Sequence, residues 1–251
     1  MKDEAERQMD RSAERQMDRG AERKMDRESG HRAFDLIVFD WDGTLMDSTA
    51  TISDSIRAAA RDLGLAVPDP QRASWVIGLG LHDSLRHAVP DLEQGRVRAF
   101  VERYRAHFLA AEMRLKPFPG IETLLEFLLR SGQTMAVATG KSRSGLDRAL
   151  HQEGWRRFFV ATRTADEGHP KPHPWMLREL MDELGVEPAR TLMIGDTTHD
   201  LEMAAAAGVR AVAVGYGAHA REELSQAKPE ALCDDVAALS AWILRAQGLS
   251  W

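Results

Sequence analysis

The sequence predicts an α/β protein, in which helices cover both faces of a parallel β-sheet and a small helical cap is inserted after the first strand. Two observations support this class. After residue 33, short apolar segments rich in Val, Ile and Leu alternate with segments of helical periodicity. Strands that alternate with helices form parallel sheets with both faces covered. Residues 48–115 then break the alternation, because they contain helical patterns and no convincing strand.

The predicted strands are apolar segments that end in Gly or Asp. Four are well marked, at residues 34–40, 134–140, 189–196 and 210–217, and a weaker fifth lies at 158–163. The helices predicted between them span residues 121–131, 143–153, 174–184 and 199–207. Ligands of parallel sheets bind at the carboxyl ends of the strands, where Asp40, Thr139 and Asp196 fall.

The inserted region contains three helical stretches, at residues 51–65, 81–89 and 94–112. We interpret it as a cap over the carboxyl edge of the sheet. The predicted division is a charged tail at 1–32, a cap at 48–115, and an α/β core formed by 33–47 and 116–251. Glycines near residue 78 indicate a loop that could turn toward the site, where His82 or Arg86 could meet a second anionic group of the substrate.

The tail repeats an eight-residue unit three times, as AERQMDRS, AERQMDRG and AERKMDRE. On a helix of 3.6 residues per turn, each copy rotates by about 80° from the last, so no lasting apolar stripe forms. Acidic and basic residues balance within residues 1–32. The tail is therefore predicted to be a solvated extension, disordered or helical. A partner-binding arm and a true start further downstream are alternative interpretations.

The composition of the chain argues against several classes of protein function. The chain has 251 residues, 43% of them hydrophobic, a net charge of −6 and a single cysteine, Cys233. The absence of a basic surplus argues against nucleic-acid binding, and no apolar run approaches the ~18 residues of a membrane span. One cysteine suits a reducing compartment. A cytoplasmic protein that acts on a small molecule is expected, and the sequence does not predict its oligomeric state.

Two carboxylates, Asp40 and Asp42, flank Trp41 at the end of the first predicted strand. Burying an unpaired carboxylate costs several kcal/mol, so a cation or a reaction that uses the charge is expected there. Asp40 could attack phosphorus to form an acyl phosphate. Asp42 could protonate the leaving oxygen and later deprotonate the attacking water. Gly43 removes a side chain where backbone N–H groups must approach phosphate.

Three further motifs fall at later strand ends or in the loops beside them. Thr139 and Gly140 end the second strand and could hold a phosphoryl oxygen. Lys171, in the proline-rich GHPKPHP, could offset negative charge on the nucleophile and the phosphoryl group. Asp196 and Asp200 offer the oxygen ligands that Mg²⁺ prefers. Each motif alone also fits a turn, a surface lysine or a helix N-cap, and their combination favours a site.

The ordered set of motifs resembles the haloacid dehalogenase-like (HAD) superfamily of hydrolases, over roughly residues 34–220. The resemblance implies a Rossmann-like core and a Mg²⁺-dependent phosphatase that works through an aspartyl phosphate. It implies that Asp40 is the nucleophile and Asp42 the general acid and base. The implied catalytic residues are Asp40, Asp42, Thr139 and Lys171. The implied substrate-binding residues are Trp41, Gly43, Thr139, Gly140 and Lys171.

For the metal, the resemblance implies a Mg²⁺ site formed by Asp40, Asp42 through its carbonyl, Asp196 and, in support, Asp200. A helical cap after the first motif is similar to the phosphoglycolate phosphatase-like branch. Trp41 departs from the smaller residue found in many relatives, but only its backbone N–H is needed. A small phosphomonoester is the expected substrate. A sugar phosphomutase and a non-catalytic phosphate-binding or partner-binding module are the alternatives.

Overall fold

The computed structural model describes residues 32–250 of the chain. Within this range, Phe34–Ile243 forms one compact unit. The predictions for the charged repeats lie outside the described residues. No helix in residues 32–250 combines the length and the apolar character that a membrane span requires.

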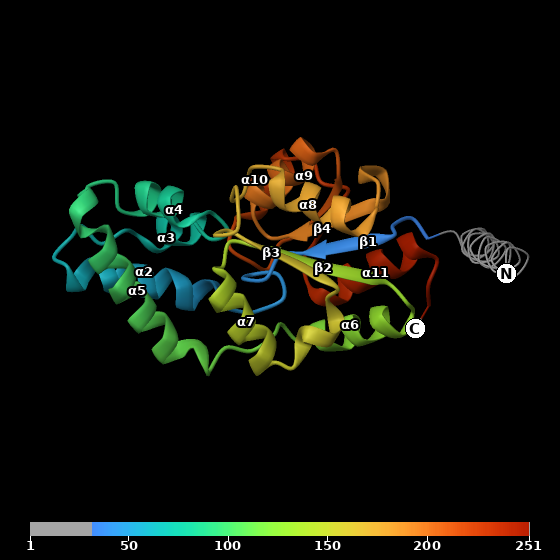
Figure 1. Cartoon of the computed structure of the whole chain (residues 1–251), viewed down its shortest axis with the longest axis horizontal. Helices are drawn as coiled ribbons and strands as arrows, with labels where there is room; N and C mark the ends of the chain where they lie inside the picture. Colours follow the sequence, from blue (N-terminus) through green and yellow to red (C-terminus); the bar gives the residue numbers. More distant parts are fainter. Residues whose placement is uncertain (1–31, 251) are drawn as a thin grey trace, which may run out of the picture. The chain divides into compact units, whose positions relative to one another are not determined.

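Six parallel strands form one sheet in the order β3-β2-β1-β4-β5-β6 (Figure 1). Their bounds are β1 Leu36–Phe39, β2 Thr134–Thr139, β3 Ala161–Thr164, β4 Thr191–Gly195, β5 Arg210–Val214 and β6 Ala231–Cys233. In the middle of the sheet, Leu36 of β1 pairs with Thr134 of β2 on one side and Thr191 of β4 on the other. The strand order reverses at β1, which is where such sheets bind ligands. The predicted α/β class with a parallel sheet is confirmed.

Helices cover both faces of this sheet (Figure 1). On one face lie α6 Ile121–Arg130 and α7 Arg143–Gln152, and on the other α8 Trp175–Leu184 and α9 Thr198–Ala207. Alternate strand residues join an apolar cluster with α8 and α9, whose members include Leu36, Val38, Ala136, Met193, Met176, Leu180 and Met203. Because both faces are covered, all four residues of β1 are buried, which explains the continuous apolar run in the sequence.

Between β1 and α6 the chain forms four α-helices, α2 Thr49–Asp62, α3 Pro70–Trp75, α4 Leu81–Ala88 and α5 Val97–Glu112. They share their own apolar cluster, which includes Ile52, Ile56, Val76, Phe100 and Phe108. The sequence pattern does not predict α3, a short helix that Asp69 caps by accepting a hydrogen bond from the Arg72 N–H. We call α2–α5 and their connections the cap segment, and its standing as a separate domain stays a prediction.

Several elements differ from the sequence prediction. The strand expected at 158–163 begins later, because Trp155–Phe158 forms a 3₁₀ turn. At the carboxyl-terminal end, β6, α10 Arg221–Gln226 and α11 Val236–Gln247 were not predicted. A three-residue edge strand such as β6 is too short for an alternating pattern to appear. The remaining 3₁₀ turns are Gln94–Arg96 and Pro188–Arg190.

Candidate active site

Three buried carboxylates and one lysine converge at the carboxyl ends of β1 and β4. Asp40 follows β1, Asp196 follows β4, and Asp200 lies in the first turn of α9. Their oxygen atoms lie within 4.8 Å of one another. The Lys171 Nζ is fully buried between them, at 2.5 Å from Asp40 Oδ1 and 2.6 Å from Asp200 Oδ1. The structure thus brings together four of the predicted site residues, Asp40, Lys171, Asp196 and Asp200.

Asp40 presents one free carboxylate oxygen. Its backbone N–H donates to the Ile194 carbonyl at 2.9 Å, which fixes the residue to β4. Its Oδ1 accepts from Lys171, whereas its buried Oδ2 has no hydrogen-bond partner within residues 32–250. Burial raises the pKa of Asp40 to about 7, against the lowering effect of Lys171 and with a further rise from the charge of Asp200. A buried oxygen without a hydrogen-bond partner in the protein is suited to contact a ligand or a cation.

Asp196 is held rigidly at the same edge. Its two oxygens accept hydrogen bonds from Thr44 Oγ1 at 2.8 Å and from the Ala218 N–H at 2.7 Å. Burial raises its pKa well above the usual range, and the nearby charges of Asp40 and Asp200 raise it further. Metal-free carboxylates this close together disfavour ionisation, and a bound cation would remove that penalty.

Asp200 serves the helix as well as the site. Thr197 is the N-cap of α9, and Asp200 completes a capping box with it. The Thr197 hydroxyl donates to Asp200 Oδ2 at 2.7 Å, while Oδ1 faces Lys171. The interpretation of Asp196 or Asp200 as the helix N-cap is therefore wrong, because Thr197 is the N-cap and Asp200 is its capping-box partner at N3. The capping box does not compete with a role of Asp200 in the site.

Two glycines are required because carboxylates occupy the space of a side chain. Gly43 has φ +86°, and a Cβ there would lie 2.1 Å from Asp196 Oδ2. A Cβ on Gly217 would lie 2.2 Å from the same carboxylate. The sequence pattern predicts that Gly43 lets backbone N–H groups approach phosphate closely. In the structure, Gly43 also packs closely against the Asp196 carboxylate.

Asp42 points to a different set of partners. Its carboxylate accepts from Ser48 Oγ at 2.7 Å and from Lys141 Nζ at 3.0 and 3.1 Å. Within the described residues it stands outside the three-carboxylate group. Its predicted metal contact through the backbone carbonyl stays a prediction. Nothing in the sequence pattern singled out Lys141 or Ser48, because neither belongs to a spacing that carries chemistry on its own.

The remaining predicted residues lie close to this edge. Thr139 is buried, and its Oγ1 accepts from the Lys141 N–H at 3.2 Å. Trp41 is also buried, with its ring 5.7 Å from that of Trp155. A Cβ on Gly140 would lie 2.7 Å from the Gly78 carbonyl oxygen. The loop after β2 therefore touches both the sheet edge that carries the site and the cap segment.

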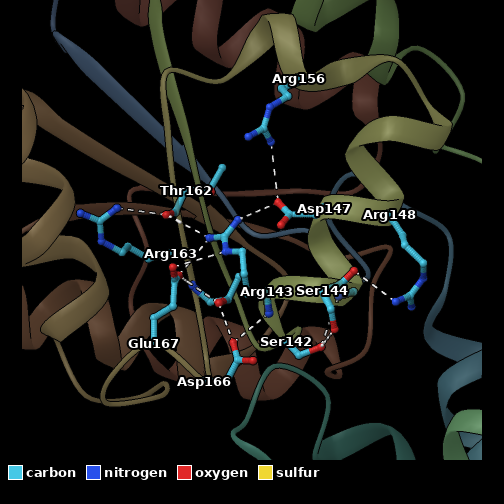
Figure 2. Close-up of polar contacts among 12 residues, drawn as sticks. Ser142, Arg143, Ser144, Asp147, Arg148, Arg156, Thr162, Arg163, Asp166 and Glu167 are labelled. Atoms are coloured by element: carbon cyan, nitrogen blue, oxygen red, sulfur yellow. Dashed lines mark hydrogen bonds and ion pairs between the residues drawn. The ribbon is translucent and has the colours of Figure 1, made fainter.

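Arg143 lies in a polar network beside the site (Figure 2). Its guanidinium donates to Glu167 at 2.9 Å, and its backbone N–H donates to Asp166 at 2.8 Å. Asp166 and Glu167 belong to the loop that leads to Lys171, whereas Arg143 follows Lys141 closely in sequence. The network therefore fixes the loops that carry the two lysines relative to each other.

One backbone carbonyl of the cap segment accepts two hydrogen bonds from the core. The Trp75 carbonyl accepts hydrogen bonds from His199 Nε2 at 3.0 Å and from His219 Nε2 at 2.9 Å. The Trp75 ring packs against both imidazoles, at 4.8 and 5.8 Å between centroids. Both histidines are buried. Two residues of the core thus hold the end of α3 over the site.

Comparison with known proteins agrees with this geometry. The sequence model of the haloacid dehalogenase-like hydrolase family matches residues 37–214. The probable phosphatase IndB of Dickeya dadantii is 38% identical over 205 residues, covering 79% of this chain and 89% of that protein. A phosphoglycolate phosphatase of Chromobacterium violaceum is 33% identical over 193 residues, covering 72% and 85%. The structure of a predicted phosphatase from Clostridium acetobutylicum is similar with TM-score 0.75 and 26% identity, covering 84% and 99%.

Other relatives carry the names 5′-nucleotidase and tyrosine-protein kinase, so the activities named for the relatives differ in their substrates. The resemblance to HAD hydrolases, including relatives named phosphoglycolate phosphatase, is confirmed. The family match spans most of the described chain, and these phosphatase relatives align over most of their own length. This chain therefore belongs to the haloacid dehalogenase-like hydrolase family.

Proposed function

We propose that this protein is a Mg²⁺-dependent phosphatase that hydrolyses a small, phosphoglycolate-like phosphomonoester through an aspartyl phosphate on Asp40. Family membership and the names of its relatives make it a phosphoric monoester hydrolase. The observation that carries the finer proposal is the free Oδ2 of Asp40, buried beside Lys171 and two further carboxylates.

The carboxylate group fits a small divalent cation. Three buried acidic side chains share a single buried lysine, so their charges are not balanced by the protein alone. Oxygen ligands in this number suit Mg²⁺, which keeps several waters and takes one or two carboxylates together with phosphate. Asp40, Asp196 and the Asp42 carbonyl would hold it, with Asp200 in support. When bound, Mg²⁺ would neutralise the carboxylates and orient the phosphoryl oxygens.

The chain's own groups then account for two chemical steps. In the first, a bond forms from Asp40 Oδ2 to phosphorus while the ester P–O bond breaks, and Asp42 gives its proton to the leaving oxygen. In the second, Asp42 takes a proton from water as the water attacks the aspartyl phosphate and releases inorganic phosphate. Lys171 and Thr139, with the backbone N–H group of Trp41, would hold the phosphoryl oxygens. The Gly43 N–H instead donates to the Met46 carbonyl at 2.9 Å, so Gly43 serves through its missing side chain.

The two alternatives give different products. A sugar phosphomutase would return the phosphoryl group to a sugar and would depend on a bisphosphate. A non-catalytic module would bind phosphate without turnover. No contact in the structure favours either over hydrolysis, and both are separated from it by measuring phosphate release.

The test is phosphate release from p-nitrophenyl phosphate and from a panel of metabolite esters, with Mg²⁺ or with EDTA. Wild type should turn over with Mg²⁺ and stop with EDTA. Asp40→Asn keeps the shape of the side chain and removes the nucleophile, so activity should fall by on the order of 10³-fold or more. Circular dichroism should show an unchanged fold. Activity that survives in Asp40→Asn would exclude Asp40 as the nucleophile.

A further inference from the structure

Lys141 is a second lysine of the site, half-buried, and the proposed chemistry gives it no role. Its side chain is 9% exposed, and its Nζ lies 3.0 and 3.1 Å from the two oxygens of Asp42. On its other side the ammonium lies 4.9 Å from the centre of the Phe108 ring. Tyr104 stacks on Phe108 at 6.0 Å. Lys141 therefore stands between a carboxylate of the core and an aromatic wall of α5.

This position is on the path of the leaving alcohol. If Asp42 protonates the leaving oxygen, that oxygen must come within hydrogen-bond distance of the Asp42 carboxylate. The group attached to it then lies beside Lys141 Nζ, which is within 3.1 Å of both Asp42 oxygens. An ammonium has three N–H donors, and two Asp42 oxygens leave one donor for a further acceptor. The Phe108 face excludes water without offering a competing hydrogen bond.

The other cations near the site are already engaged. Lys171 is fully buried between Asp40 and Asp200. Arg86 of the cap segment pairs with Asp83 at 2.6 Å and remains 65% exposed, and His82 is 79% exposed. Lys141 thus contacts a carboxylate of the site. His82 and Arg86, which the sequence suggested as contacts of the substrate, do not.

We propose that Lys141 recognises a negative charge on the leaving alcohol. The substrates are then phosphate esters of small hydroxy acids, in which a carboxylate lies close to the ester oxygen. In phosphoglycolate one methylene separates the two, so the ester oxygen can meet Asp42 while the carboxylate meets Lys141. This inference rests on the proposed phosphatase function and adds the substrate class and the residue that selects it.

A purely structural role for Lys141 makes a different prediction. If Lys141 only holds Asp42 in place, its loss slows all esters to the same extent. If it also binds the leaving alcohol, its loss slows charged leaving alcohols more than neutral ones. The deciding quantity is therefore the ratio of kcat/KM for two esters that differ only in that charge.

The experiment compares phosphoglycolate with phosphoglycolamide, in which an uncharged amide replaces the carboxylate. Wild type should prefer the acid by about 10- to 100-fold, the size of a hydrogen bond to a charged group. Lys141→Met should lose most of that preference, chiefly through KM for the acid. Lys141→Arg should retain part of it. Lys116→Met, the same change at an exposed lysine, should keep the wild-type ratio.

Two results would overturn the inference. One is a wild-type enzyme that hydrolyses esters without favouring the acid over the amide, a measurement that needs no variant to fold. The other is an equal loss on both esters in Lys141→Met, with the melting temperature showing a folded protein. Failure of wild type to hydrolyse any ester with Mg²⁺ would instead overturn the proposed function, and this inference with it.

Discussion

The sheet edge and the cap segment contribute to the site in different ways. The edge supplies ionisable side chains, such as Asp40 and Lys171, that are fully buried at strand ends or in the loops beside them. The cap segment supplies a backbone carbonyl at Trp75, the backbone at Gly78 and the Phe108 ring. The proposed chemistry thus belongs to groups fixed by strands, whereas the proposed selection of the leaving alcohol involves contacts with helices inserted between β1 and β2.

This division explains how one edge can serve different substrates. In the proposed mechanism, groups at the ends of the paired strands β1 and β4 would hold the phosphoryl group, which every phosphomonoester shares. The cap segment meets that edge through Gly78, Trp75 and Phe108, so changes there alter what fits beside Asp42 without moving Asp40. The four predictions below separate the two contributions, from the largest expected effect to the smallest.

Replacing Lys171 tests whether the edge is structural as well as catalytic. Lys171→Met leaves Asp40 and Asp200 facing each other without their shared cation. Breaking a buried ion pair on one side should cost about 3–5 kcal/mol of stability, and kcat should fall by about 10²- to 10³-fold. Urea unfolding and phosphate release measure the two effects. Lys116→Met is the matched control. An equally large loss of stability in Lys116→Met would show that the broken ion pair is not the cause of the loss in Lys171→Met.

Gly140 tests the contact between the edge and the cap segment. A Cβ at this position would lie 2.7 Å from the Gly78 carbonyl oxygen, so Gly140→Ala must displace the cap backbone. A displacement of about 1 Å should lower kcat/KM by about 10²-fold. A Cβ built on Gly95 would meet no other part of residues 32–250 within 4 Å, apart from the adjoining backbone, which makes Gly95→Ala the control. Equal kcat/KM values for the two variants would show that the close approach does not matter.

The raised pKa of Asp40 predicts how pH changes the stability of the metal-free protein. The folded state holds this carboxyl at a pKa of about 7 through burial, against an ordinary value of 3.8. The folded state therefore binds a proton more readily, and stability from this group rises as pH falls from 8 toward 4. In EDTA, the melting temperature of wild type relative to Asp40→Asn should be higher at pH 5.5 than at pH 8.

The difference in melting temperature between wild type and Asp40→Asn removes the contributions of the other titratable groups. His199, for example, has a pKa that burial lowers to about 4, so it acts in the opposite direction over the same range. Mg²⁺ should stabilise wild type more at pH 8 than at pH 5.5, because it binds the ionised carboxylates. A wild-type protein that loses stability relative to Asp40→Asn on acidification would contradict the assigned cause.

The sequence allowed the edge to be predicted because its residues follow strands with a strong apolar pattern. Asp40 and Asp196 come directly after such strands, and parallel strands must bring their carboxyl ends together. Lys141 and Trp75 could not be predicted in the same way. Their contacts join residues about one hundred positions apart or more, and a backbone carbonyl carries no sequence signal. The packing of Asp196 against Gly217 depends likewise on a tertiary approach.

His219 tests the weakest link between the two regions, its hydrogen bond to the Trp75 carbonyl at 2.9 Å. Its other ring nitrogen accepts from the Thr198 N–H at 3.1 Å, so the neutral ring with the proton on Nε2 is required. His219→Leu removes both contacts and should cost about 1 kcal/mol, because the half-buried Thr198 N–H loses its acceptor. His219→Asn keeps an acceptor near the Nδ1 position and loses the donor to the cap. If the Trp75 contact positions the cap segment, His219→Asn should raise KM by several-fold with little change in melting temperature, whereas His219→Leu should change both. An unchanged KM in His219→Asn would show that the aromatic packing of Trp75, and not this hydrogen bond, holds the cap segment in place.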